Sequence, residues 1–272
     1  KERKEAHMLI EDFMLLANRE VATYIATKGE KGGGEVPFVY RIHDEPDPEK
    51  VEELARFARE MGFDMNINSP KEIGRSYNRL IKTAKKEVGL KLLEPLAIRT
   101  MSKAAYSTDN IGHYGLAFDN YTHFTSPIRR YSDVLVHRIL EKNLGGAYRE
   151  NKHQMEEKCR HISRQERRAV DAERESVKYK QGEFMQDHIG EVFEGIISGM
   201  IDRGFFVALT ESQCEGLVPF QTLNDSFELD GGRLSAKGVR SGKVFKMGDE
   251  VKVKILDAQL ERREIDMELV SD

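Results

Sequence analysis

The chain changes character near residue 190, and this change constrains its fold more than any other feature of the sequence. From there on, short segments alternate apolar and polar residues, and glycines separate the segments. Such alternation places every second side chain on the same face, as in a half-buried strand. The segments are 191–198, 204–209, 216–220, 250–256 and 264–269. Five short strands punctuated in this way predict a small closed β-barrel over residues 186–272.

Residues 1–185 show a helical pattern instead, with apolar residues recurring every three to four positions. Asp47-Pro48 and Ser69-Pro70 are helix start signals, because a polar cap followed by proline suits the first turn. Helices are predicted at 6–26, 48–61, 70–86, 92–105, 127–144 and 152–182, with an extended segment at 36–43 and loops at 28–35 and 106–121. The sequence therefore predicts an α+β protein, with a mostly helical part before the barrel.

The helix predicted at 6–26 has an apolar face, which is typical of a core element. Its apolar residues are Met8, Leu9, Phe13, Leu15, Leu16 and Val21. Glu11 and Asn18 interrupt this pattern, and a spacing of seven residues puts them on one face. Buried polar groups need partners, so these two are either satisfied core residues or part of a solvated edge.

The stretch 121–133 (YTHFTSPIRRYSD) is predicted to run from a loop into a helix. Ser126 suits the cap and Pro127 suits the first helical position. Arg129 and Arg130 would then lie in the first turn, beside unpaired backbone N–H groups. Two guanidinium groups there repel each other unless an anion lies nearby, which suits a phosphate. The alternative is a pair of solvated arginines that happen to begin a helix.

Side chains of metal-ligand type also gather in and around this stretch. They are Asp109, His113, Asp119, His123, Asp133 and His137. Their spacing matches no known metal signature. We therefore expect loop, cap and structural roles for them, and no metal site.

The charge of the chain argues against a simple basic nucleic-acid binder. The formal net charge is −4, with 33 Lys+Arg and 31 Asp+Glu in residues 1–189 and 10 and 16 in residues 190–272. Any contact with nucleic acid should therefore be a local channel or stripe. Two distant cysteines, Cys159 and Cys214, are expected to be free or buried thiols. With no long apolar run and no signal-peptide pattern, we expect a cytoplasmic monomer that does not enter a membrane.

The stretch 121–133 resembles the hallmark of the ribonuclease II/R (RNB) family, the processive 3′→5′ exoribonucleases. Four other stretches resemble the family in the expected order: 6–18 (AHMLIEDFMLLAN), 41–46 (RIHDEP), 112–117 (GHYGLA) and 165–168 (QERR). Residues 190–198 (GEVFEGIIS) and 204–207 (GFFV) resemble the S1 form of the five-stranded OB-fold. The resemblance implies the C-terminal portion of an RNB catalytic domain over residues 1–185, followed by an S1 RNA-binding domain over 186–272.

The resemblance also implies an activity: processive hydrolysis of RNA from the 3′ end to nucleoside 5′-monophosphates, with Mg²⁺ on a cluster of aspartates. No close Asp-Asp cluster of that form occurs in residues 1–272. We therefore expect the metal ligands upstream, in an N-terminal part of the same protein, and the chain alone to be inactive. The expected partners are single-stranded RNA and that N-terminal part. The alternative is a non-catalytic RNA-binding or adaptor protein that kept the fold.

Individual residues match positions of the family. Arg129 matches the catalytic arginine, and Arg130 beside it is expected to contact RNA. Glu11 matches a carboxylate near the ribose of the terminal nucleotides, which favours RNA over DNA. Glu173 matches a carboxylate near the product end, at a position that is less uniform in the family and leaves its role here open.

The helix predicted at 152–182 carries a basic stripe that contains one acid, Asp171. Its basic residues are Arg160, Arg164, Arg167, Arg174 and Lys178. By itself the stripe fits two interpretations equally. One is a solvated helix with ion pairs to nearby glutamates, and the other is a wall of an RNA channel. The family places this helix beside the active site, which favours the channel.

In the barrel, Phe205 and Phe206 of the second predicted strand point to opposite faces. Phe205 is expected in the core, whereas an exposed Phe206 would stack on an RNA base. Arg203 and Arg263 are also expected to contact RNA. However, Arg203 stands where many S1 domains carry an aromatic residue, and Pro219 stands where many carry a histidine. These departures predict a weak grip on RNA.

Overall fold

The computed structural model describes residues 2–31, 34–84, 90, 93–146 and 148–270. The chain forms two compact units, one from Lys1–Arg79 and Leu96–Arg168, the other from Leu80–Pro95 and Ala169–Asp272. The division into domains at residue 185 stays a prediction. Within the described residues, we find no helix with the length and apolarity that crossing a membrane requires.

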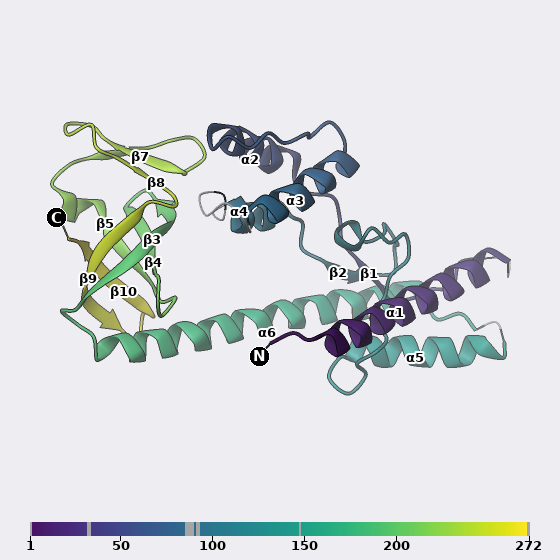
Figure 1. Cartoon of the computed structure of the whole chain (residues 1–272). Helices are drawn as coiled ribbons and strands as arrows, with labels where there is room; N and C mark the ends of the chain where they lie inside the picture. Colours follow the sequence, from purple (N-terminus) through teal and green to yellow (C-terminus); the bar gives the residue numbers. More distant parts are fainter. Residues whose placement is uncertain (1, 32–33, 85–89, 91–92, 147, 271–272) are drawn as a thin grey trace. The chain divides into compact units, whose positions relative to one another are not determined.

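The helices of the chain are α1 (Glu5–Lys31), α2 (Pro48–Glu60), α3 (Pro70–Ala84), α4 (Leu93–Thr100), α5 (Tyr131–Leu144) and α6 (Lys152–Gln186) (Figure 1). A short antiparallel pair joins β1 (Tyr40–Ile42) to β2 (Ala105–Ser107). The short 3₁₀ helix η2 (Tyr114–Leu116) follows β2.

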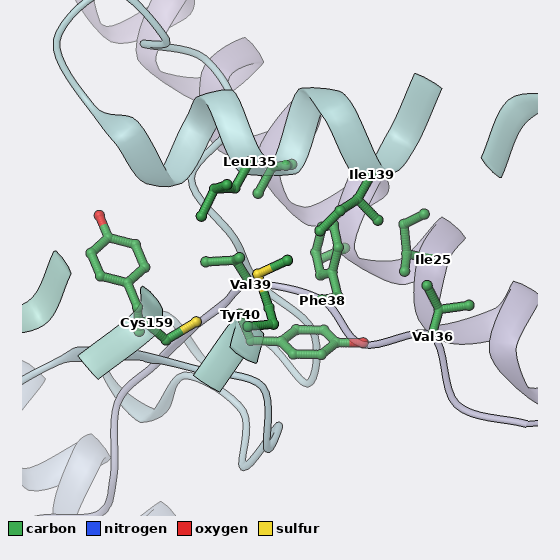
Figure 2. Packing of buried hydrophobic residues seen from close by; sticks show 12 residues of the cluster. Ile25, Val36, Phe38, Val39, Tyr40, Leu135, Ile139 and Cys159 are labelled. Atoms are coloured by element: carbon green, nitrogen blue, oxygen red, sulfur yellow. The ribbon is translucent and has the colours of Figure 1, made fainter. Parts of the chain in front are cut away.

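The core of the first unit gathers residues from α1, the segment 36–40, α5 and the start of α6. Figure 2 shows Phe38 and Val39 between Ile25 of α1 and Leu135 and Ile139 of α5. Cys159 of α6 is fully buried at its edge, and its thiol is free, as predicted. This core packs α1, the segment 36–40, α5 and the start of α6 together, so the loops between them gain a rigid support.

Two of the predicted helix starts are confirmed. Asp47 caps α2, because its side chain accepts a hydrogen bond from the backbone N–H of Glu49, and Pro48 occupies the first turn. Pro70 begins α3 in the same way, and the side chain of Ser69 accepts a bond from the N–H of Glu72.

Several predictions for the first unit were wrong. Helix α1 continues through residues 28–31, where a loop was expected. Residues 36–39 are buried but form no strand, so the strand is only β1. The helix predicted at 92–105 ends at Thr100, and β2 begins at Ala105. The glycine pair 32–33 of the predicted loop lies outside the described residues.

Helix α1 also differs from a core element in its N-terminal half. Met8, Leu9, Ile10, Phe13, Met14 and Leu16 are exposed, with Phe13 at 59%. Burial begins at Asn18 and continues with Ala22 and Ile25. The apolar face is present as predicted, but none of the residues that the structure describes covers its first three turns.

The second unit contains the predicted barrel. Its strands are β3 (Val192–Ile201), β4 (Gly204–Leu209), β5 (Glu215–Pro219), β9 (Glu250–Gln259) and β10 (Glu264–Leu269). They close in the order β10-β5-β4-β3-β9 (Figure 1). The register pairs Phe205 with Val218 and Phe206 with Leu217. Gly204 permits the close approach of β4 to β5, because a Cβ there would lie only 2.3 Å from the carbonyl oxygen of Val218.

The connection between β5 and β9 forms a three-stranded sheet that the sequence pattern did not indicate. Its strands are β6 (Phe227–Leu229), β7 (Ser235–Gly238) and β8 (Val244–Lys246), and all pairs are antiparallel. The ring centroid of Phe245 lies 5.0 Å from that of Phe205 in β4, and the ring centroid of Phe227 lies 4.8 Å from that of Phe220, the residue after β5. The sheet therefore extends the barrel core through an aromatic cluster.

Candidate functional site

The loop that contains residues 121–126 is fixed by buried hydrogen bonds. The side chain of Asn18 binds it at two points: its Nδ2 donates to the hydroxyl of Tyr121 (3.1 Å), and its Oδ1 accepts from the N–H of Phe124 (2.9 Å). Between them, the hydroxyl of Thr122 donates to the carbonyl of Val39 at 2.6 Å. The sequence left open whether Asn18 is a satisfied core residue or part of a solvated edge, and these hydrogen bonds identify it as a satisfied core residue.

The predicted start of helix α5 was wrong by four residues. Residues 127–129 form a turn, and the helix begins at Tyr131. The carbonyl of Ser126 accepts hydrogen bonds from the N–H groups of Arg129 and Arg130, and no side chain caps the helix at Arg130. The cause lies in Asp133, whose carboxylate draws the N–H of Ser126 to 2.7 Å.

Asp133 also accounts for the two adjacent arginines. This side chain is fully buried, and its oxygens lie 3.0 Å from both Nη2 and Nε of Arg130. The anion required beside Arg130 is therefore a carboxylate of the chain itself. Arg129 is exposed, and its side chain forms no ion pair with any residue that the structure describes.

A second group of side chains contacts the same loop through His123. Tyr106 shares a hydrogen bond of 2.7 Å with Nδ1 of His123. The guanidinium of Arg41 lies 4.6 Å from the ring centroid of Tyr106 and forms an ion pair of 2.6 Å with Glu166. Sequence analysis did not select Arg41 or Tyr106 as site residues, although Arg41 is the first residue of the stretch 41–46.

Burial keeps His123 and His113 beside the loop neutral. The pKa of His123 is lowered to about 3, first by burial and then by the charges of Arg130 and Arg41. Burial also lowers the pKa of His113 to about 4, helped by its stacking partner His43. Nδ1 of His113 accepts a bond from the N–H of Leu116. These histidines therefore serve as neutral structural groups near pH 7.

A groove of about 610 Å³ lies beside Tyr106 in the first unit. Its lining residues are Ala105, Tyr106, Glu157, Arg160, Ser163, Arg164 and Arg167. Three of the four arginines of the predicted stripe thus line one groove. Arg160 is paired with Glu156 at 3.2 Å, whereas Arg164 and Arg167 have no ion pair within the described part of the chain. The groove offers guanidinium groups to an anionic ligand.

The predicted carboxylates have different surroundings. Glu11 is exposed and forms an ion pair with Arg3 at 2.5 Å, so it is a solvated side chain in this structure. Glu173 is exposed on α6 next to Arg174. Neighbouring residues of a helix point about 100° apart, so these two side chains do not share one face.

The residues predicted in the second unit lie around the barrel. Phe205 is fully buried, as predicted. Phe206 points to the other face and is partly buried, not fully exposed. Arg203 pairs with Glu264 at 3.5 Å, and Arg263 forms an ion pair with Glu175 of α6. Both arginines therefore have acidic partners, and the weak grip on RNA stays a prediction.

A metal site needs several ligand side chains held close together. Among the described residues, no three side chains of His, Cys, Asp or Glu come close enough together to hold one. The buried carboxylate of Asp133 is already saturated by Arg130, Ser126 and Ser132. The residues described do not fit Mg²⁺.

Two protein families match the chain. The RNB domain matches residues 1–146, and the S1 RNA binding domain matches residues 186–269. Ribonuclease R of Aquifex aeolicus is 40% identical over 274 residues, which cover 99% of this chain and 38% of that protein. Ribonuclease R of Escherichia coli is 34% identical over 284 residues, which cover 99% of this chain and 34% of that protein. The chain therefore spans less than two fifths of the length of these relatives.

The fold also matches a solved structure. The apo form of Mycoplasma genitalium RNase R superposes with a TM-score of 0.87 at 26% identity, over 99% of this chain and 42% of that one. The similarity includes both the helical part and the barrel.

Proposed function

Because the chain belongs to the RNB family of exoribonucleases, we propose that it is part of an enzyme that hydrolyses RNA processively from the 3′ end to nucleoside 5′-monophosphates. The observation that carries the proposal is the exposed guanidinium of Arg129, unpaired among the described residues, on a turn fixed by buried polar contacts. We propose that this enzyme acts in the cytoplasm as a monomer and that single-stranded RNA is its substrate.

In this proposal Arg129 holds the phosphoryl oxygens of the scissile linkage. A guanidinium presents two parallel N–H donors to a phosphate, and it stays protonated at any physiological pH. It therefore stabilises the negative charge that develops in the transition state, but it cannot act as the base that activates water. Arg130 lies next to it, yet its charge is balanced by Asp133. In this proposal Arg129 contacts the substrate, whereas Arg130 stabilises the fold.

The groove beside Tyr106 is the proposed path of the RNA backbone in the first unit. Arg164 and Arg167 supply charges that can approach phosphates without first breaking an internal ion pair among the described residues. Binding of this kind is electrostatic and independent of base sequence. It suits an enzyme that moves along any single strand.

The experiment is the replacement of Arg129 in the intact protein. We expect Arg129→Ala to lower turnover by ~10²–10³, the usual loss of one transition-state donor, and to change RNA affinity much less. Arg138→Ala is the matched control, because Arg138 is an exposed arginine of α5 without an ion pair among the described residues. Normal turnover of Arg129→Ala would remove this residue from the site. RNA binding without any hydrolysis by the intact wild-type protein would favour the adaptor.

We further propose Mg²⁺ as the cofactor, held by residues outside this chain. No step assigned here to Arg129 passes through the metal. The exposed apolar side chains of α1, from Met8 to Leu16, are the surface that we assign to the N-terminal part of the same protein. Contiguous apolar patches of this kind mark interaction sites.

It follows that residues 1–272 alone should not degrade RNA, even with Mg²⁺. The measurement is single-turnover digestion of a labelled RNA by the chain, with Arg129→Ala as the control for contaminating nuclease. Adding a purified N-terminal part should restore some 3′→5′ activity. Hydrolysis by the lone chain that disappears in Arg129→Ala would contradict this proposal.

A further inference from the structure

The turn that carries Arg129 is held at both ends by one buried carboxylate. We propose that Asp133 is a positioning residue for the reaction: it fixes the 126–130 turn so that Arg129, and not Arg130, faces the substrate phosphate. This inference rests on the proposed function. It assigns a role that differs from fold maintenance and from direct contact with RNA.

The contacts of Asp133 leave its oxygens no freedom. Oδ1 accepts hydrogen bonds from the N–H of Ser126 at 2.7 Å and from Nη2 of Arg130 at 3.0 Å. Oδ2 accepts from the hydroxyl of Ser132 at 3.0 Å and lies 3.0 Å from Nε of Arg130. The side chain has no exposed surface. A buried carboxylate requires such partners, so the position of the turn is tied to the position of Asp133.

These contacts bracket Arg129 in the sequence. Ser126 lies three residues before it and Arg130 one residue after it, and both bind the same carboxylate. The carbonyl of Ser126 then closes the turn by accepting from the N–H of Arg129 at 3.3 Å. The backbone of Arg129 is therefore fixed on both sides, while its side chain is exposed and has no ion pair within the part of the chain that the structure describes.

The fixed position of Arg129 affects the rate of the reaction much more than the affinity for RNA. A displacement of about 1 Å of a group that acts in the transition state costs about 10²-fold in rate. The affinity of RNA is a sum over many phosphate contacts, so one displaced arginine changes it little. Loss of the Asp133 charge would also release Arg130 as a second cation beside the substrate. RNA should then bind as tightly as before, or more tightly, while turnover falls.

The experiment compares Asp133→Asn with the wild type in the intact protein. Asparagine keeps the shape and one acceptor oxygen but loses the charge that holds Arg130. We expect kcat to fall about 10-fold to 100-fold, with no weakening of the Kd for a single-stranded RNA. Turnover is expressed per folded molecule, with the folded fraction taken from circular dichroism.

The decisive measurement is a double-mutant cycle with Arg129→Ala. If Asp133 acts through Arg129, Asp133→Asn should lower kcat by no more than about 2-fold in the Arg129→Ala background. A merely structural residue would lower kcat by the same factor in both backgrounds, which would overturn the proposal. If Asp133→Asn does not fold, Arg130→Gln in both backgrounds replaces it, because this change breaks the same ion pair at a side chain that is 20% exposed. Arg130→Lys, which restores the charge, should recover part of the loss.

The two proposals fail in different ways. If Arg129→Ala alone has normal turnover, the proposed role of Arg129 is wrong. If Arg129→Ala loses turnover but Asp133→Asn is neutral, or its effect persists in the double variant, Asp133 is not the positioning residue.

Discussion

The two phenylalanines of β4 provide a matched pair of substitutions, because they are adjacent in sequence and occupy opposite faces of the barrel wall. Phe205 is fully buried, and its ring centroid lies 5.0 Å from that of Phe245 and 6.1 Å from that of Phe220. Truncating a buried phenylalanine to alanine costs ~3–5 kcal/mol, and lost aromatic pairs add to the upper part of this range. We expect Phe205→Ala to destabilise the chain by about 4–5 kcal/mol.

Phe206 should respond differently. Its ring lies on the outer face of β4 and is partly covered by the backbone of Gly199, where an added Cβ would be 3.7 Å from the ring. We expect a loss of stability of about 1 kcal/mol, since partial burial contributes a fraction of the full value. Stacking of the ring on a base contributes ~1–3 kcal/mol, so Phe206→Ala should weaken RNA binding by roughly 5-fold to 150-fold.

Both quantities can be measured on the chain itself. It contains no tryptophan, so urea unfolding is followed by circular dichroism, and RNA binding by the anisotropy of a labelled single strand. Stable Phe205→Ala together with unstable Phe206→Ala would mean that the two faces are exchanged. Unchanged RNA affinity in Phe206→Ala would show that this face of the barrel does not stack on bases.

Two further predictions concern the first unit. The pKa values of about 3 for His123 and about 4 for His113 lie below the unfolded value of 6.5, so the unfolded state binds protons more readily. The free energy of unfolding should therefore be highest above about pH 6.5 and decrease toward pH 4. Each histidine lowers it by at most ~1.4 kcal/mol per pH unit, and by less because both side chains are partly exposed. Urea unfolding at pH 7 and pH 5 should show a smaller difference for His123→Gln than for the wild type. In the intact protein, Glu11→Ala should lower the ratio of the RNA cleavage rate to the DNA cleavage rate. Glu20→Ala removes another exposed, ion-paired acid of α1 and should leave this ratio unchanged.

The barrel could be predicted from sequence because alternation is a local property. Five segments of five to eight residues reveal their inward face by every second residue, and β3, β4, β5, β9 and β10 form the closed barrel that was predicted. The sheet of β6, β7 and β8 escaped prediction for the same reason. Its strands have three or four residues, which is too short for a period of two to be distinguished from chance.

Helix starts were predictable only where local contacts decide them. At Asp47-Pro48 the cap and the helix lie within three residues, and the prediction was correct. At Ser126-Pro127 the same local signal is overridden by Asp133, which lies seven residues from Ser126 and is fully buried. A buried charge has far stronger requirements than a cap, because an unpaired carboxylate in the interior costs several kcal/mol and a cap contributes about 1. The turn therefore forms around the carboxylate, and the helix begins later.

The arginine stripe illustrates a different limit. Helical spacing placed Arg160, Arg164 and Arg167 together, and the structure confirms that they line one groove. Spacing could not show what forms the opposite wall. That wall includes Tyr106, whose N–H binds the hydroxyl of Ser163 across 57 residues of sequence. Contacts between residues so far apart in the sequence depend on the packed core, and they produce no periodic pattern in the sequence.

The pair Arg129 and Arg130 shows why a site needs both kinds of information. In sequence the two residues have the same chemistry, and only a resemblance to a family distinguishes them. In the structure, a carboxylate three residues further along the chain accepts a hydrogen bond from Nη2 of Arg130 and lies 3.0 Å from its Nε, whereas Arg129 forms no ion pair with any residue that the structure describes. A fully buried partner of this kind removes one positive charge from the surface and, through Ser126, fixes the backbone on which the other is carried. Repulsion between adjacent guanidinium groups, which suggested a bound anion, is thus relieved before any substrate arrives. Arg129 thus presents an exposed guanidinium on a turn that the buried carboxylate holds in place, which is the basis of the transition-state role that we propose for it.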